Sequence, residues 1–145
     1  MNLNVKIKQL DNSLELPKYA YAGDAAMDLR SAVDVCIKPG CRECVPCGIS
    51  IEVPSGFAAL VLPRSGHALK HGISVVNAPG LIDSNYRGEV KAILLNTDNE
   101  HSFEIHAGDR VAQLMIIEVP HIELEPVDEL SESCRSVAGF GSSGV

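Results

Sequence analysis

The apolar positions of this chain recur in short runs, and polar or turn-forming residues separate the runs. At the start, Leu3, Val5 and Ile7 alternate with polar residues, which is the period of a strand with one buried face. Clusters of Pro, Gly, Asn and Asp stand between the runs, as they do between strands that turns connect. The pattern predicts strands over Leu3–Leu10, Val33–Ile37, Ile49–Val53, Phe57–Leu62, Ile73–Val76, Glu89–Asn96, Ser102–Ile105, Val111–Val119 and Ile122–Pro126.

The number and length of these runs indicate the fold class, because many short strands with regular turns are typical of β-sandwiches, jelly rolls and barrels. A helical period is present only over Ser65–Gly72. The 145 residues suffice for one core and are too few for two. After Val127 the sequence becomes polar and rich in Gly and Ser. We expect an all-β fold with at most one short helix, with a β-barrel core over residues 1–127 and a flexible arm over 128–145.

The formal net charge of −7 narrows the possible partners. A protein that binds duplex nucleic acid usually carries a basic surface, so we expect no nucleic-acid partner. A few Arg and Lys side chains can still bind a small anion. The N-terminal residues lack the apolar core of a signal peptide, and no apolar run approaches the roughly 20 residues that span a bilayer. We therefore expect a cytoplasmic protein without a membrane partner.

Four of the five cysteines, Cys36, Cys41, Cys44 and Cys47, lie close together along the chain. Similar spacings hold zinc or iron–sulfur clusters in other proteins. Cys41, Cys44 and Cys47, however, lie in a turn that leads into a strand, where successive side chains point to opposite faces. Cys41 and Cys47 would then face away from Cys44, which is a poor geometry for one metal. We interpret these cysteines as small buried apolar residues or incidental thiols rather than metal ligands.

The segment PRSG, Pro63–Gly66, lies between a predicted strand and the short helical stretch. Arg64 offers a planar charged fork, Ser65 a hydroxyl and the first helical turn its backbone N–H groups, so this turn could bind an anion. The alternative is that Ser65 caps the helix and Arg64 is solvated. These residues alone leave both interpretations open.

The segment GLIDSNYRG, Gly80–Gly88, has the pattern of a turn before a long strand. Asp83 follows two apolar residues, and a carboxylate in a partly apolar pocket can act as a general base towards water. An Asp in a turn can instead cap local backbone, and Tyr86 can be a core aromatic. Upstream, Asn77 could read a base edge or close a turn. Further along, Gln113 lies inside a predicted buried strand and needs a hydrogen-bond partner, either a ligand or backbone.

These segments belong to an ordered set that extends over nearly the whole chain. In order they are AGDAAMDLRS at 22–31, PRSGHALKHGI at 63–73, NAPGLIDSNYRGEV at 77–90, GDRVAQL at 108–114 and RSVAGFGSSG at 135–144. They resemble the five motifs of the dUTPase family, most specifically in the second, third and fourth segments. The resemblance implies a jelly-roll or distorted β-barrel subunit of the dUTPase-like kind. It also implies a homotrimer with active sites at subunit interfaces that hydrolyses dUTP to dUMP and pyrophosphate with Mg²⁺, which keeps uracil out of DNA and supplies dUMP for thymidylate synthesis.

The resemblance also implies a role for each matching residue. Asp83 would activate the water that attacks the α-phosphorus and would contact the sugar 3′-hydroxyl, while Tyr86 would pack under the deoxyribose and exclude a 2′-hydroxyl. The uracil would be bound by a hairpin that includes Asn77, Gly80, Leu81, Ile82 and Lys91. The phosphates would be bound by Arg64, Ser65, Gly66 and Gln113, and Asp28 would support the metal through water. From another subunit, Arg135, Phe140 and Gly141 would close over the phosphates and the base.

The sequence departs from the family pattern at a few positions. Ala26 replaces a glycine in the first segment, which would tighten the turn before the motif's aspartate. His67 replaces an aliphatic residue, and we expect no chemical role for it. In the fifth segment, Ser136 and Ala138 replace glycines. Residues with a Cβ resist positive φ, so the arm would close less readily or along a different path.

Two other functions are compatible with such a fold. The related dCTP deaminases need a Glu base in the strand after the Asp-containing turn, and the matching position here is Ile93, which cannot transfer a proton. A binding or regulatory protein could retain the fold without turnover. The intact Asp83 and Tyr86 argue against that alternative, while the altered fifth segment leaves it open.

Overall fold

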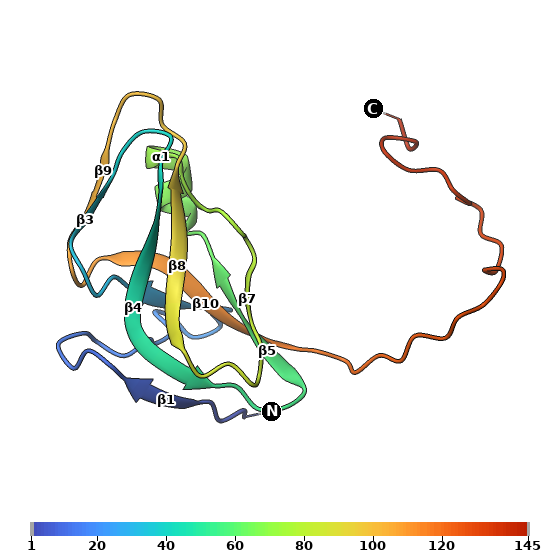
Figure 1. Cartoon of the computed structure of the whole chain (residues 1–145), viewed down its shortest axis with the longest axis horizontal. Coiled ribbons are helices and arrows are strands. Elements are labelled where there is room, and N and C mark those ends of the chain that lie inside the picture. The colour runs from blue at the N-terminus through green and yellow to red at the C-terminus, as the bar shows by residue number, and fades with distance from the viewer. Residues whose placement is uncertain (1, 145) are drawn as a thin grey trace.

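The structure, a computed structural model, describes residues 2–144, and its regular elements are strands with one short helix (Figure 1). In this range the ten strands are β1 (Lys6–Gln9), β2 (Met27–Arg30), β3 (Val35–Ile37), β4 (Arg42–Glu52), β5 (Phe57–Leu62), β6 (Ile73–Val75), β7 (Gly80–Ile82), β8 (Glu89–Asn96), β9 (Phe103–Ile105) and β10 (Arg110–Glu118). The one helix in the same range, α1 (Ser65–His71), follows β5. The prediction of an all-β fold with one short helix is confirmed. No helix among the described residues is long and apolar enough to cross a membrane.

Two four-stranded sheets and one two-stranded sheet make up the fold. The first has the order β1-β4-β8-β6, the second the order β2-β10-β5-β7, and the third pairs β3 with β9. All of these pairings are antiparallel. Neighbouring strands such as β2 and β10 come from opposite ends of the sequence, so the second sheet depends on long-range contacts.

The core lies between the inner faces of the two larger sheets. On β8, Val90, Ala92 and Leu94 are buried and alternate with more exposed residues, as expected when one face of an antiparallel sheet packs on a core. They belong to one apolar cluster with buried residues of the other sheet, among them Ala59 of β5 and Leu114 of β10. Small and branched aliphatic side chains therefore fill this core, in a chain that has no Trp.

The observed strands differ from the predicted ones where the apolar pattern is weak, or where an apolar segment has no neighbouring strand to pair with. The pattern does not predict β2 or β7, because each is only three or four residues long and lies within a motif. β4 begins at Arg42, seven residues before the predicted start at Ile49. The apolar pattern missed its first part because the strand begins with three exposed residues. The predicted strand over Ile122–Pro126 is wrong, because these exposed residues pair with no strand among residues 2–144.

The C-terminal segment leaves the sheets after β10 and runs away from them (Figure 1). Residues 119–144 form no helix or strand, and nearly all of their side chains are exposed. Ser136 has a φ of 48°, a left-handed value that a residue with a Cβ adopts at a cost. Ala138 has no such value. The last residue of the predicted arm, 145, lies outside the described residues.

The cysteines do not gather at one point. Cys47 on β4 is 3% exposed, whereas Cys36, Cys41 and Cys44 are exposed. The opposite placement of Cys44 and Cys47 agrees with the prediction, but Cys41 does not share the side of Cys47, because it lies in the turn before β4. Burial raises the pKa of the Cys47 thiol to about 12, and the nearby Glu89 carboxylate adds to the effect. Over residues 2–144, no group of three or more His, Cys, Asp or Glu side chains is placed to hold a metal ion.

Candidate active site

A pocket of about 200 Å³ lies along β7, β8 and the turn between them and is called here the β7–β8 pocket. Its lining residues are Cys44, Val61, Asn77, Gly80, Leu81, Ile82, Asp83, Tyr86, Glu89, Val90, Lys91 and Ile93. The residues that the sequence assigned to the uracil hairpin and to the sugar are all in this set, whereas Phe140 and Gly141, which were expected over the base, are not. The predicted hairpin is corrected in one respect: β7 pairs with β5 while β8 pairs with β4 and β6, so the segment connects the two large sheets.

Local hydrogen bonds shape the turn between β7 and β8. The Tyr86 N–H donates to the Asp83 carbonyl over 3.1 Å, and the Arg87 guanidinium donates to two further carbonyls of the turn at 2.6 and 3.0 Å. The Tyr86 hydroxyl donates to the Glu89 carbonyl at 3.0 Å. A Cβ on Gly88 would overlap the Tyr86 ring, so the ring can fold back over the turn only because this residue is glycine.

The side chains of Asp83 and Tyr86 are accessible at this pocket. The turn is closed through the Asp83 carbonyl, and the Asp83 side chain is exposed. The interpretation that its carboxylate caps the turn is therefore wrong. Tyr86 is 44% exposed, so it is not a core aromatic. Asn77 is exposed as well and lines the same pocket.

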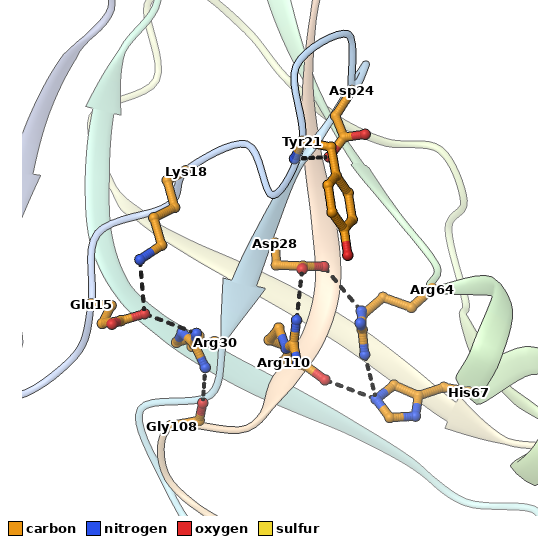
Figure 2. Close-up of polar contacts among 10 residues, drawn as sticks. All are labelled: Glu15, Lys18, Tyr21, Asp24, Asp28, Arg30, Arg64, His67, Gly108 and Arg110. Carbon is orange, nitrogen blue, oxygen red and sulfur yellow. Dashed lines mark hydrogen bonds and ion pairs between the residues drawn. The ribbon is translucent and has the colours of Figure 1, made fainter.

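A second group of polar residues lies where β2, β5 and β10 meet (Figure 2). In the strand register, Gln113 of β10 lies between Asp28 of β2 and Leu62 of β5. A cavity of about 450 Å³ is lined by Asp28, Arg64, Arg110 and Gln113, among others. These four residues are called the arginine cluster below. They come from three motifs that are far apart in the sequence.

Asp28 lies between the two guanidinium groups of this cluster (Figure 2). Arg64 donates from Nε to Asp28 Oδ1 at 3.0 Å, and Arg110 Nη1 lies 3.6 Å from Asp28 Oδ2. The carboxylate holds together two positive groups that would otherwise repel each other. Their remaining N–H groups can donate to an anion such as a phosphate. Arg64 is therefore ion-paired rather than simply solvated.

Ser65 and Gly66 are the first residues of α1. The N-cap is Arg64, with extended backbone at φ −91° and ψ 128°, and no side chain caps the helix. The interpretation that Ser65 caps the helix is therefore wrong. Both residues are exposed beside Arg64, where the Ser65 hydroxyl is available to a ligand.

His67 connects α1 to the arginine cluster. Its Nε2 lies 2.8 Å from the Arg110 carbonyl and 3.3 Å from Arg64 Nη1. Because a carbonyl only accepts, the shorter contact places the proton on Nε2, which then cannot also accept from Arg64. The ring packs edge-on against Phe103, with the centroids 5.2 Å apart. Through these contacts His67 links α1 to β10 and to Phe103. The sequence did not indicate this structural role.

Arg110, Cys44 and Glu89 are residues of these sites to which the sequence assigned no role. Arg110 lies inside the fourth motif, and its charge at the start of a buried strand was the available signal. Cys44 and Glu89 line the β7–β8 pocket. Their places depend on the register of β4 and β8, in which Cys44 lies opposite Ile93, and the apolar pattern does not contain this information.

The pocket, the cluster and the arm lie apart in this chain. Among residues 2–144, none lines both the β7–β8 pocket and the cavity at the arginine cluster. Arg135, Phe140 and Gly141 are exposed on the C-terminal segment, which points away from the sheets (Figure 1). One chain therefore does not unite all of the residues that the sequence assigned to a single site.

Comparison with known proteins gives a family match that covers all five motif segments. The dUTPase family matches residues 12–144 of the chain. The chain belongs to the dUTPase family. The deoxyuridine 5′-triphosphate nucleotidohydrolase of Thermobifida fusca is 51% identical over 142 residues, which cover 98% of this chain and 79% of the relative. That of Leifsonia xyli is 52% identical over 129 residues, which cover 89% and 85%. The predicted family and enzyme class are confirmed.

Solved dUTPases share the fold. The Staphylococcus bacteriophage 80alpha dUTPase with dUPNHPP has a TM-score of 0.90 and 28% identity, and the match covers 98% of this chain and 99% of that one. The predicted jelly-roll-like fold of the family is thereby confirmed. These likenesses assign no role to an individual residue of this chain.

Proposed function

We propose that this chain hydrolyses dUTP to dUMP and pyrophosphate, with Asp83 as the general base. The observation that carries the proposal is the β7–β8 pocket, where the exposed Asp83 side chain shares a lining with Tyr86 and Asn77. The relatives are named deoxyuridine 5′-triphosphate nucleotidohydrolases, and the phage neighbour was solved with dUPNHPP. These names support a deoxyuridine nucleotide as the substrate.

The lining of the pocket suits a pyrimidine nucleoside. Backbone groups of residues 80–82, together with Asn77 and Lys91, would bond to the edge of uracil. A wrong base would leave buried donors and acceptors unpaired, which can separate substrates by a factor on the order of 10⁴. The accessible Tyr86 ring would pack under the deoxyribose and leave no room for a 2′-hydroxyl.

Asp83 would accept a proton from a water molecule as the water oxygen attacks the α-phosphorus. The bond between this phosphorus and the bridging oxygen then breaks, and pyrophosphate leaves. The Asp83 side chain is exposed at the pocket, and it would also contact the 3′-hydroxyl. General base catalysis of this kind typically contributes about 10²–10⁴-fold to the rate.

The arginine cluster and the adjacent start of α1 would bind the phosphates. Arg64, Ser65, Gly66 and Gln113 supply a guanidinium, a hydroxyl, a backbone N–H and an amide. The Asp28 carboxylate holds the Arg64 guanidinium in place at 3.0 Å, so less freedom is lost when the phosphates bind. This order within the free protein supports a preformed anion site.

We propose that Mg²⁺ binds at this site together with the substrate. Residues 2–144 contain no metal-binding group of three or more side chains, and Asp28 already lies beside two guanidinium groups. Mg²⁺ usually keeps several waters and binds through one or two carboxylates plus substrate phosphates. The donor set therefore fits an ion held by the triphosphate, with Asp28 reached through water. When bound, the ion would orient the phosphate oxygens and neutralise charge that develops on them.

We further propose a homotrimer in which different subunits supply the pocket, the arginine cluster and the arm to each active site. The separation of these parts in one chain supports this assembly. Ile122, Leu124 and Leu130 of the C-terminal segment are 70%, 88% and 88% exposed, so a neighbouring subunit could cover these apolar side chains. The arm over residues 128–145 would then bring Arg135, Phe140 and Gly141 over the phosphates and the base.

A nucleotide panel tests the proposed reaction. The purified protein is incubated with dUTP, dCTP, dTTP and UTP, with Mg²⁺ or with a chelator, and pyrophosphate and ammonia are measured. We expect Mg²⁺-dependent pyrophosphate release from dUTP and little from the others. Ammonia release from dCTP would instead establish a deaminase, although Ile93 lines the pocket where that activity needs a carboxylate. Binding of dUTP without product would establish a protein that only binds the nucleotide.

A further inference from the structure

Glu89 is a pocket residue that the proposed chemistry does not use. It begins β8 and lines the β7–β8 pocket together with Asp83 and Tyr86. Its carboxylate Oε2 accepts from the backbone N–H of Gly48 at 3.0 Å. Its carbonyl accepts from the Tyr86 hydroxyl at 3.0 Å. Glu89 therefore contacts β4 through its carboxylate and Tyr86 through its carbonyl.

Gly48 is a firm anchor for this connection. The register of β4 and β8 shifts over residues 46–50, and within this stretch the Gly48 N–H donates to the Glu89 side chain. The Gly48 carbonyl accepts from the N–H groups of Leu10 and Asp11 at 2.8 and 3.1 Å. Gly48 is also buried, with a φ of 69°. Because its backbone is bonded on both sides and enclosed, it can hold the Glu89 carboxylate in one place.

We propose that Glu89 is a positioning residue, which ties the turn after β7 to the Gly48 backbone and thereby orients Tyr86 against the sugar. This inference rests on the proposed function, because it takes Tyr86 as the residue that excludes a 2′-hydroxyl. Its consequence is that preference for dUTP over UTP depends on the Glu89 carboxylate as a hydrogen-bond acceptor. A negative charge or a transferable proton at Glu89 is not required.

The ratio of kcat/KM for dUTP to kcat/KM for UTP measures this effect. The ratio does not change when a variant merely has a smaller folded fraction, since both substrates lose equally. We expect Glu89→Ala to lower the ratio about tenfold, within the 10²-fold that a displacement of about 1 Å can cost. Glu89→Gln keeps an acceptor for the Gly48 N–H and should retain the ratio. Glu43→Ala removes an exposed glutamate of β4 outside the pocket and serves as the matched control.

A double variant tests whether Glu89 acts through Tyr86. Tyr86→Phe removes the hydroxyl that donates to the Glu89 carbonyl and should lower the same ratio. If the two residues act as one unit, Glu89→Ala combined with Tyr86→Phe loses no more selectivity than the larger single loss. Amide hydrogen exchange supplies a readout without turnover. Residues 84–88 and Gly48 should exchange faster in Glu89→Ala, and at the wild-type rate in Glu89→Gln.

The outcomes separate this inference from the proposed function. An unchanged ratio in Glu89→Ala, with both substrates slowed equally, overturns the positioning role while dUTP hydrolysis stands. Loss of kcat in Glu89→Gln as severe as in Glu89→Ala also overturns it, because it shows that the charge or the proton of the carboxyl group is required rather than an acceptor alone. A wild-type protein that releases no pyrophosphate from dUTP overturns the proposed function, and unaltered exchange in Glu89→Ala then removes the anchor as well.

Discussion

The β7–β8 pocket and the arginine cluster draw their residues from different distances along the chain. Most of the pocket comes from residues 77–93, and its turn is closed by hydrogen bonds between near neighbours. Three members of the arginine cluster, Asp28, Arg64 and Gln113, meet only through the pairing of β10 with β2 and β5. The first site is therefore built locally and the second by the sheet. We infer that recognition of the nucleoside and binding of the phosphates can be perturbed separately.

The largest effect should come from the pocket and should fall on the rate alone. Asp83→Asn keeps the size of the side chain but removes the proton acceptor, so we expect kcat to fall at least about a hundredfold. Steady-state kinetics with dUTP, together with calorimetric binding of dUMP, separate rate from binding. Ser84→Ala alters the neighbouring residue of the same turn and should leave kcat close to that of the wild type. Turnover of Asp83→Asn at the normal rate would remove Asp83 from its assigned role.

The next effect should come from the arginine cluster and should fall on phosphate binding. Arg64→Gln removes a charged donor, and hydrogen bonds to charged groups contribute about 1.5–3 kcal/mol. We expect dUTP to bind about tenfold to a hundredfold more weakly, with binding of deoxyuridine unchanged. Calorimetry in an Asp83→Asn background avoids turnover. Arg42→Gln, at the exposed start of β4, is the matched control. Equal weakening of both ligands would show that the two sites are not separable.

A smaller effect should come from the arm, which lines neither site of its own chain. Removing residues 135–145 deletes Arg135 and Phe140 and leaves every strand in place. We expect kcat for dUTP to fall about tenfold through loss of a closing segment, with an unchanged melting temperature. Kinetics and thermal unfolding of the same preparation test both parts. An unaffected kcat would identify the segment as a frayed end.

The smallest expected effect is a change in the rate at which the Cys44 thiol is alkylated. Cys44 lines the β7–β8 pocket, so bound dUMP should slow its alkylation, whereas the exposed Cys36 should react equally with or without dUMP. Cys47 should stay unmodified at pH 8, because burial raises its pKa to about 12 and leaves almost no thiolate. Peptide mass spectrometry after a timed reaction with iodoacetamide reads all three sites. Protection of Cys36 rather than Cys44 would place the nucleotide elsewhere.

The residues of one contiguous motif could be assigned to a common site from the sequence. Asp83, Tyr86 and Asn77 lie within one contiguous motif, and they do line one pocket. The alternatives for Asp83 and Ser65 remained open, because a turn and a helix start have the same residue types whether or not they bind a ligand. The structure decided both, through the carbonyl that closes the turn and the N-cap at Arg64.

Other features depended on pairing that no local pattern contains. The alternating apolar residues over Ile122–Pro126 have the period of a strand, yet they form none without a partner edge. The contact of Glu89 with Gly48 arises where the register of β4 and β8 shifts. The pairing of Asp28 with Arg64 and Arg110 likewise requires three strands to be adjacent.

The amino-acid sequence by itself determined the all-β class, the motif order and the chemistry of the turn around Asp83. Those properties follow from side-chain period and from the backbone preferences of near neighbours. Only the tertiary structure decided what Asp28 binds, where Glu89 is anchored and that Ile122–Pro126 remains unpaired. The physical reason is that strand pairing brings distant residues together, and a register shift of one residue moves every side chain to the other face.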